Sequence, residues 1–171
     1  MLNDIQLSPH FRLREFTESD TARKHGIDNN PPPEAVGNLR SLCEGCLEPL
    51  REALGLPVVV TSGFRTKELN DLLAHSSDRS QHMQGRAADF YIKGSASTSS
   101  ATVSRRDLLV TAFKLILTSP EMDFDQLILY PSFIHVSFVS KERNRRGILL
   151  ARGDGKLGYG RLSLSSALQI T

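Results

Sequence analysis

Residues 80–92 read Ser-Gln-His-Met-Gln-Gly-Arg-Ala-Ala-Asp-Phe-Tyr-Ile, and residues 133–137 read Phe-Ile-His-Val-Ser. Together they supply two histidines and one carboxylate: His82, Asp89 and His135. Catalytic zinc sites favour three such ligands because the fourth position stays open for water. His82 and Asp89 lie seven residues apart with Gly85 between them, so a tight turn could bring both side chains to one ion. His135 must then arrive from a distant strand.

The alternation of side chains supports this grouping. Successive residues of a strand point to opposite faces of a sheet. Asp89 therefore shares a face with Tyr91, whereas Ala88, Phe90 and Ile92 form the apolar face. His135 likewise points away from the apolar face formed by Ile134, Val136 and Phe138. The pattern alone leaves open a second interpretation, in which His135 is a half-buried structural histidine and Asp89 caps a turn.

The remaining periodicities predict helices first and short strands later. Apolar residues recur at helical spacing over residues 34–54 and 105–117, and Pro49 should kink the first of these helices. Shorter helices are expected at residues 20–24 and 67–75, and strands at residues 58–61, 87–92, 125–130, 133–139 and 147–152. This order predicts an α+β fold with a small antiparallel sheet and helices packed on one face.

A chain of 171 residues has the length of one domain. We expect this domain to span residues 1–152 and the Gly- and Ser-rich residues 153–171 to form a flexible tail. Residues 94–104 predict a mobile surface loop, either a plain connector or a lid. Cys43 and Cys46 fit a helix core better than a redox pair or half of a zinc knuckle, because the chain has no second cysteine pair.

Composition excludes several classes of function. A net charge of +2 is too small to argue for nucleic acid, and the absence of Trp disfavours a base-stacking platform. No apolar run approaches the roughly 18–20 residues of a membrane span. The first residues lack the basic and apolar regions of a signal peptide, so we expect synthesis in the cytoplasm. Separately, we expect the protein to be a monomer. A basic patch, which comprises Lys141, Arg143, Arg145 and Arg146, could attract anionic wall polymers or form a solvated strand edge.

Three blocks of the sequence resemble one known family. Residues 80–89 have the form Ser-x-His-x-x-Gly-x-Ala-x-Asp, which resembles the signature of the zinc D-alanyl-D-alanine peptidases. This family includes the vancomycin-resistance D,D-dipeptidases and phage L-alanyl-D-glutamate endopeptidases. Residues 61–70, with Thr-Ser-Gly-Phe-Arg and then Leu-Asn, and residues 133–137 are similar to two further family segments, and residues 7–16 resemble a bacterial and prophage branch. The resemblance covers roughly residues 7–152 and implies a Hedgehog/DD-peptidase-like fold.

The resemblance implies a zinc metallopeptidase that hydrolyses peptide bonds in peptidoglycan stem peptides, as a D,D-carboxypeptidase or an endopeptidase. It implies Zn²⁺ bound by His82, Asp89 and His135, with a zinc-activated water as the nucleophile. Arg65 should stabilise the oxyanion or hold a substrate carboxylate, since a guanidinium matches both. The matching Ser80 should contact substrate. Such an enzyme would act at the cell wall after its release.

The general base departs from the family pattern. Many members carry an acidic residue three positions before the last histidine ligand, or a histidine five positions before it, and these positions are Ser132 and Tyr130 here. Tyr130 could still act as a hydrogen-bond donor or electrophile. Other residues could supply a base (His10, His75 or Asp125) or support a metal-bound histidine (Asp125 or Gln126). The alternative function is a non-catalytic zinc module that binds peptidoglycan or a protein partner, as Hedgehog signalling domains do on a similar fold.

Overall fold

The computed structural model describes residues 5–74, 76–94, 103–151 and 159–171. Its strands are β1 (Gln6–Ser8), β2 (Phe11–Arg12), β3 (Val58–Ser62), β4 (Ala87–Ile92), β5 (Gln126–Leu129), β6 (Ile134–Ser137), β7 (Gly147–Ala151) and β8 (Tyr159–Arg161). Its α-helices are α1 (Leu13–Thr17), α2 (Asp20–His25), α3 (Pro33–Leu42), α4 (Glu48–Leu54), α5 (Lys67–Leu72), α6 (Arg105–Thr118) and α7 (Leu164–Leu168). A π-helix, η2 (Cys43–Leu47), joins α3 to α4, and a short 3₁₀ helix, η3 (Gln81–Gln84), precedes β4.

The main sheet has six strands in the order β3-β4-β6-β5-β7-β8. β5 and β7 are parallel, whereas the other neighbouring pairs are antiparallel. The mixture of helices and strands is as expected, but the expectation of a small antiparallel sheet is wrong. The chain leaves β6, passes the end of β5 and adds β7 on the far side of β5. The alternation within a strand reports which face is buried but not which strand lies beside it.

The C-terminal residues also differ from the expected flexible tail. β8 pairs with β7, and α7 follows it. Ala167 of α7 is fully buried, and Leu162, Leu168 and Ile170 pack against the core. A three-residue strand and a five-residue helix are too short for a pattern of apolar residues to predict them from the sequence. Residues 153–158, and most of the loop expected at residues 94–104, lie outside the described residues.

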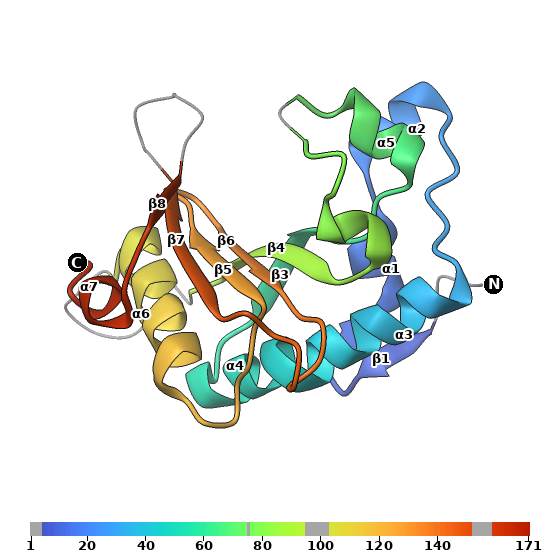
Figure 1. The fold of residues 1–171 in the computed structure, drawn as a ribbon. Coiled ribbons are helices and arrows are strands. Elements are labelled where there is room, and N and C mark those ends of the chain that lie inside the picture. Colours follow the sequence, from blue (N-terminus) through green and yellow to red (C-terminus); the bar gives the residue numbers. More distant parts are fainter. Residues whose placement is uncertain (1–4, 75, 95–102, 152–158) are drawn as a thin grey trace.

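One face of the sheet forms the core. Ala88 and Phe90 of β4 are fully buried, as are Leu109, Phe113 and Ile116 of α6, and all of them belong to one cluster. Figure 1 shows α2 and α5 together on one side of the molecule, away from α6 and α7. In the described part of the chain, no helix is long and apolar enough to span a membrane. The core therefore leaves the other face of β4 and β6 for polar side chains.

The kink expected from Pro49 takes the form of the π-helix η2. Proline lacks the N–H that would bond the carbonyl four residues earlier in an α-helix, and that carbonyl belongs to Gly45. The Gly45 carbonyl instead accepts a hydrogen bond from the Asp123 N–H at 3.1 Å. Cys43 and Cys46 lie within η2 as free, fully buried thiols, so their predicted place in the core is confirmed.

Candidate metal centre

His82, Asp89 and His135 meet on the polar face of the sheet. Asp89 and His135 are directly opposite each other in the β4–β6 pair, so their side chains share a face. His82 reaches the same point from η3. One ligand atom from each residue lies within 4.8 Å of the other two, so the group could hold a metal ion. The predicted convergence of the three residues is thus present in the structure.

The spacing within the group suits a small tetrahedral ion. The His82 Nε2 lies 3.3 Å from the His135 Nδ1 and 3.4 Å from the Asp89 Oδ1. The His135 Nδ1 lies 2.8 Å from the same carboxylate oxygen. Ligands at zinc-typical bond lengths of about 2.1 Å would be separated by about 3.4 Å around a tetrahedron. Because two imidazole nitrogens and one carboxylate oxygen face one another at such distances, the donor set fits zinc.

The protonation states favoured by the surroundings also suit a metal. Burial lowers the pKa of His82, which favours the neutral imidazole that metals require. Burial acts to raise the pKa of Asp89, but its electrostatic interactions and hydrogen bonds with His82 and His135 outweigh this effect and hold that pKa well below its usual range. Asp89 is therefore an ionised carboxylate. The His82 side chain is 5% exposed, and the side chains of His135 and Asp89 are 12% and 14% exposed, so the group is largely buried with a small accessible part at these two residues.

Gly85 explains how η3 can deliver His82. Its backbone has a φ of 66°, a left-handed conformation that glycine adopts without steric cost. A Cβ at this position would lie 2.4 Å from the Ala35 carbonyl oxygen, so a larger residue would push η3 away from α3. The Asn38 side chain also donates to the Gln84 carbonyl at 2.8 Å. The glycine of the motif is thus required for both the turn and the close contact with α3.

The imidazole of His82 is oriented by the backbone of Gly63. The His82 Nδ1 lies 2.6 Å from the Gly63 carbonyl oxygen, so Nδ1 donates and Nε2 faces the metal group. Gly63 in turn packs against Phe16, where a Cβ would lie 2.6 Å from the Phe16 Cα. Asn29 holds the same region, since its amide donates to the carbonyls of Thr17 and Phe64 at 2.9 and 3.0 Å. The sequence contained the glycine but gave no sign of this carbonyl.

Arg65 lies beside the group and contacts one of its members. Its NH2 nitrogen donates to the Asp89 Oδ2 at 3.1 Å, while Nε and NH2 both donate to the Ser62 Oγ. Burial lowers the pKa of Arg65, and the nearby Asp89 and Tyr130 oppose this effect. An arginine remains charged in proteins. Arg65 therefore brings a positive charge to the outer oxygen of Asp89.

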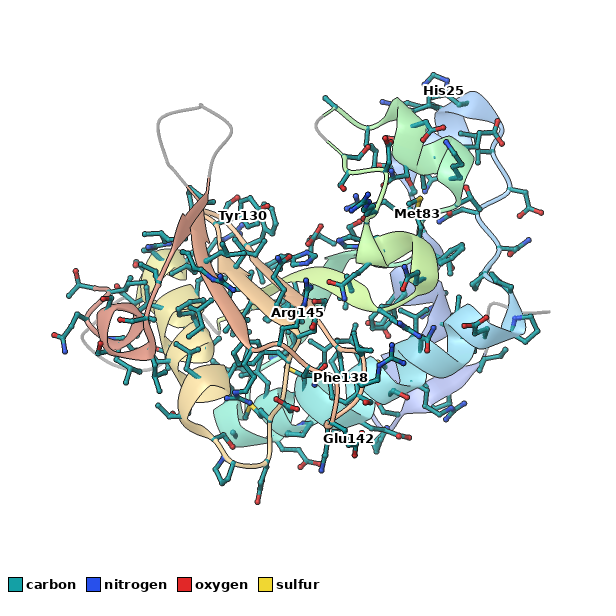
Figure 2. All side chains as sticks on the ribbon, in the orientation of Figure 1. His25, Met83, Tyr130, Phe138, Glu142 and Arg145 are labelled. Carbon is teal, nitrogen blue, oxygen red and sulfur yellow. The ribbon has the colours of Figure 1, made fainter. Side chains whose placement is uncertain are left out.

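The other two predicted site residues lie at the edges of the group. Ser80 immediately precedes η3, and its carbonyl accepts from the Met83 N–H at 3.1 Å. Tyr130 follows β5, and its ring stacks on Phe133 with 4.1 Å between the ring centroids. Tyr130 interacts electrostatically with Arg65, which contacts the metal group at Asp89. In Figure 2, Tyr130 lies at the end of the sheet, with Met83 of η3 across from it.

The structure limits the residues considered as a base. His10 and Ser8 both bind Glu48 of α4, so this histidine has a structural partner. Asp125 accepts hydrogen bonds from Arg145 and Gln81 rather than from a histidine. Burial acts to raise the pKa of Asp125, but these bonds outweigh it and lower that pKa, so Asp125 is a weak base. His75 lies outside the described residues.

The basic patch is partly neutralised by two aspartates. Arg145 pairs with Asp125, and Arg146 pairs with Asp123, each at 2.5 Å. Two of the four positive charges therefore have a carboxylate partner within the protein. This arrangement favours a structural role for Arg145 and Arg146 over the attraction of anionic polymers.

The comparison with protein families agrees with the motifs. Residues 9–115 match a family described as Peptidase M15. Because the match covers more than half of the chain, the protein belongs to this family, and the resemblance to zinc D-alanyl-D-alanine peptidases is confirmed at the family level. Membership of this family supports the assignment of the protein as a metallopeptidase. A comparison with curated proteins gave no match.

Proposed function

We propose that the protein is a zinc metallopeptidase that hydrolyses peptide bonds in peptidoglycan stem peptides, either as a D,D-carboxypeptidase or as an endopeptidase. The observation that carries this proposal is the convergence of His82, Asp89 and His135 within 4.8 Å in a chain of the Peptidase M15 family. Peptidases of this family are typically zinc-dependent. On this proposal the substrate is part of the cell wall, so the protein acts there after release.

His82, Asp89 and His135 would hold the zinc ion. Bound zinc would supply Lewis-acid chemistry that activates water and polarises a peptide carbonyl. Burial of His82 keeps its imidazole neutral, and the Gly63 carbonyl fixes the direction of the ring. Substrate would approach from the side where Asp89 and His135 retain 14% and 12% side-chain exposure.

Arg65 and Tyr130 are the residues that we assign to catalysis. The Arg65 Nε donates a hydrogen bond to Ser62 and its NH2 donates one to Asp89, so its positive charge lies beside the metal group. There it can orient Asp89 and stabilise negative charge that develops on the substrate oxygen. Tyr130, which interacts with Arg65, can donate a hydrogen bond to the same oxygen. Ser80, directly before η3, would bond the substrate backbone.

A second function is favoured by one specific observation. Ser132 and Tyr130 occupy the positions where related peptidases carry an acidic residue or a histidine. Neither side chain is a good base near neutral pH, and loss of a general base typically lowers the rate about 10²–10⁴-fold. The alternative is therefore a zinc module without activity that binds peptidoglycan or a protein partner.

The test uses a synthetic pentapeptide stem that ends in D-Ala-D-Ala, incubated with the zinc-loaded protein and analysed by mass spectrometry. Release of free D-alanine identifies a D,D-carboxypeptidase, whereas a cut within the stem identifies an endopeptidase. The His135→Ala variant serves as the control without a metal site, and Arg65→Ala tests the assigned charge. Binding of the peptide without cleavage would favour a peptidoglycan-binding module, and neither binding nor cleavage would contradict both the peptidase and the peptidoglycan-binding form of the alternative.

A further inference from the structure

A buried carboxylate links the two segments that carry the histidines of the metal group. Asp125, which directly precedes β5, is only 1% exposed. Its backbone N–H donates to the Ser137 carbonyl of β6 at 2.7 Å, two residues after His135. Its side-chain Oδ2 accepts from the Gln81 Nε2 of η3 at 3.0 Å, one residue before His82. Asp125 therefore contacts both segments at once.

Arg145 fixes the orientation of this carboxylate. Its backbone N–H and its Nε donate to the Asp125 Oδ1 at 2.9 and 2.8 Å, and its NH2 donates to Oδ2. A carboxylate held by two parallel donors of one guanidinium cannot rotate without breaking both bonds. The Asp125 Oδ2, which accepts the hydrogen bond from Gln81, is thus held at a fixed position relative to β5 and β6.

Gln81 is held at its backbone as well as at its side chain. Its carbonyl accepts from the Arg86 N–H at 3.0 Å, which closes the turn between η3 and β4. Without the bond to Asp125, η3 would be fastened by its contacts with α3 and by the hydrogen bonds around Gly63 and Arg65. η3 also approaches β6 within the metal group itself, where the His82 Nε2 lies 3.3 Å from the His135 Nδ1. The bond from Gln81 to Asp125 adds a hydrogen bond between η3 and the start of β5 outside the metal group.

We infer that Asp125, Arg145 and Gln81 form a brace that sets the distance between His82 and His135, so that Asp125 and Gln81 are positioning residues for the metal group. The inference rests on the proposed function, because it assigns the brace to a metal site. Groups that hydrogen-bond a ligating side chain typically change metal affinity about 10–100-fold. Asp125 and Gln81 act one residue away from the ligands, so we expect the lower end of this range, about tenfold.

Asp123 provides a matched control. It lies two residues before Asp125 and binds the same loop, with Arg146 at 2.5 Å and Asn144 at 2.8 Å. Both of these partners belong to the loop between β6 and β7, whereas Asp125 also reaches η3. A role of the brace in folding the loop alone would be disturbed equally by Asp123→Asn and Asp125→Asn.

The experiment compares Gln81→Met, Asp125→Asn and Asp123→Asn with the unaltered protein. One readout is the affinity for Co²⁺ and Zn²⁺, measured by competition with a chromophoric chelator. The other is amide hydrogen exchange of residues 81–86 in the metal-free protein. We expect Gln81→Met and Asp125→Asn to weaken metal binding about tenfold and to speed exchange in η3. Asp123→Asn should change neither readout, even if it lowers the melting temperature.

Unchanged affinity and exchange in Gln81→Met would overturn the inference, as would equal losses in Asp123→Asn. Gln81→Met removes a half-buried side chain's amide without creating a cavity, so it keeps the test decisive if Asp125→Asn fails to fold. If the unaltered protein binds neither Co²⁺ nor Zn²⁺, the proposed function fails. The exchange comparison then decides by itself whether the brace holds η3.

Discussion

Replacement of Gly63 by alanine should disturb the metal group without changing any of its ligands. The added Cβ would lie 2.6 Å from the Phe16 Cα and Cβ and 2.7 Å from the Phe16 carbonyl oxygen. Because two of these atoms belong to the backbone, the segment around Gly63 or the segment around Phe16 must move. The Gly63 carbonyl that accepts from the His82 Nδ1 at 2.6 Å moves with it. Overpacking of this kind typically costs about 1–3 kcal/mol, which corresponds to a fall in melting temperature of about 2–12 °C for a chain of this length.

The expected loss of metal affinity is about 10–100-fold, because the carbonyl fixes the direction of a ligating imidazole. Gly37→Ala is the control, since a Cβ there meets nothing within 4 Å and alanine favours the α3 helix. Melting curves by circular dichroism and a chelator competition with Zn²⁺ measure both effects. A Gly63→Ala protein that melts like the Gly37→Ala control and binds zinc as tightly would refute the account of the Phe16–Gly63–His82 contact.

Three further changes test other parts of the site and core. Arg65→Ala should retain zinc and lose at least tenfold in turnover of a stem peptide, and unchanged turnover would exclude its catalytic role. Bonds from Arg145 and Gln81 lower the pKa of Asp125, so its contribution to stability is present above the unfolded-state pKa of about 3.9 and is lost as the pH falls below it. The difference in melting temperature between the unaltered protein and Asp125→Asn should therefore shrink as the pH falls below about 4, and a constant difference would contradict this. Burial raises the pKa of Cys46 to about 12 and that of Cys43 further, so a thiol reagent should modify both only after unfolding; rapid modification of the native protein would show that η2 opens.

Strand alternation predicted that Asp89 and His135 lie on the polar face, and the resemblance to known peptidases, rather than the alternation, implied that they are metal ligands. The fold then had only to pair β4 with β6 for the two side chains to meet. His82 was predictable from its spacing to Asp89 and from the glycine that turns the chain between them. The resemblance to known peptidases added the expected metal and the class of substrate.

The supporting contacts could not be predicted in the same way. The Gly63 carbonyl that orients His82 is a backbone atom, and the sequence records only side chains. The bond between Gln81 and Asp125 joins residues 44 positions apart, so no local pattern in the sequence reveals it. Sequence reasoning suggested Asp125 as support for a histidine, but its partner is the residue beside that histidine.

The sheet was underestimated for a related reason. β8 has three residues, and its place depends on pairing with β7 rather than on an apolar pattern of its own. The proline at position 49 correctly predicted a break in the long helix. The form of the break, a π-helix whose Gly45 carbonyl binds Asp123, depends on a contact 78 residues away.

The most direct test of the central claim is the zinc content of the purified protein after reconstitution and dialysis, measured by elemental analysis beside His82→Ala and His135→Ala. The account predicts about one zinc per chain in the unaltered protein and a loss of stoichiometric zinc in both variants. No zinc in the unaltered protein, or full retention of zinc in both variants, would contradict the assignment of His82, Asp89 and His135 as the metal ligands.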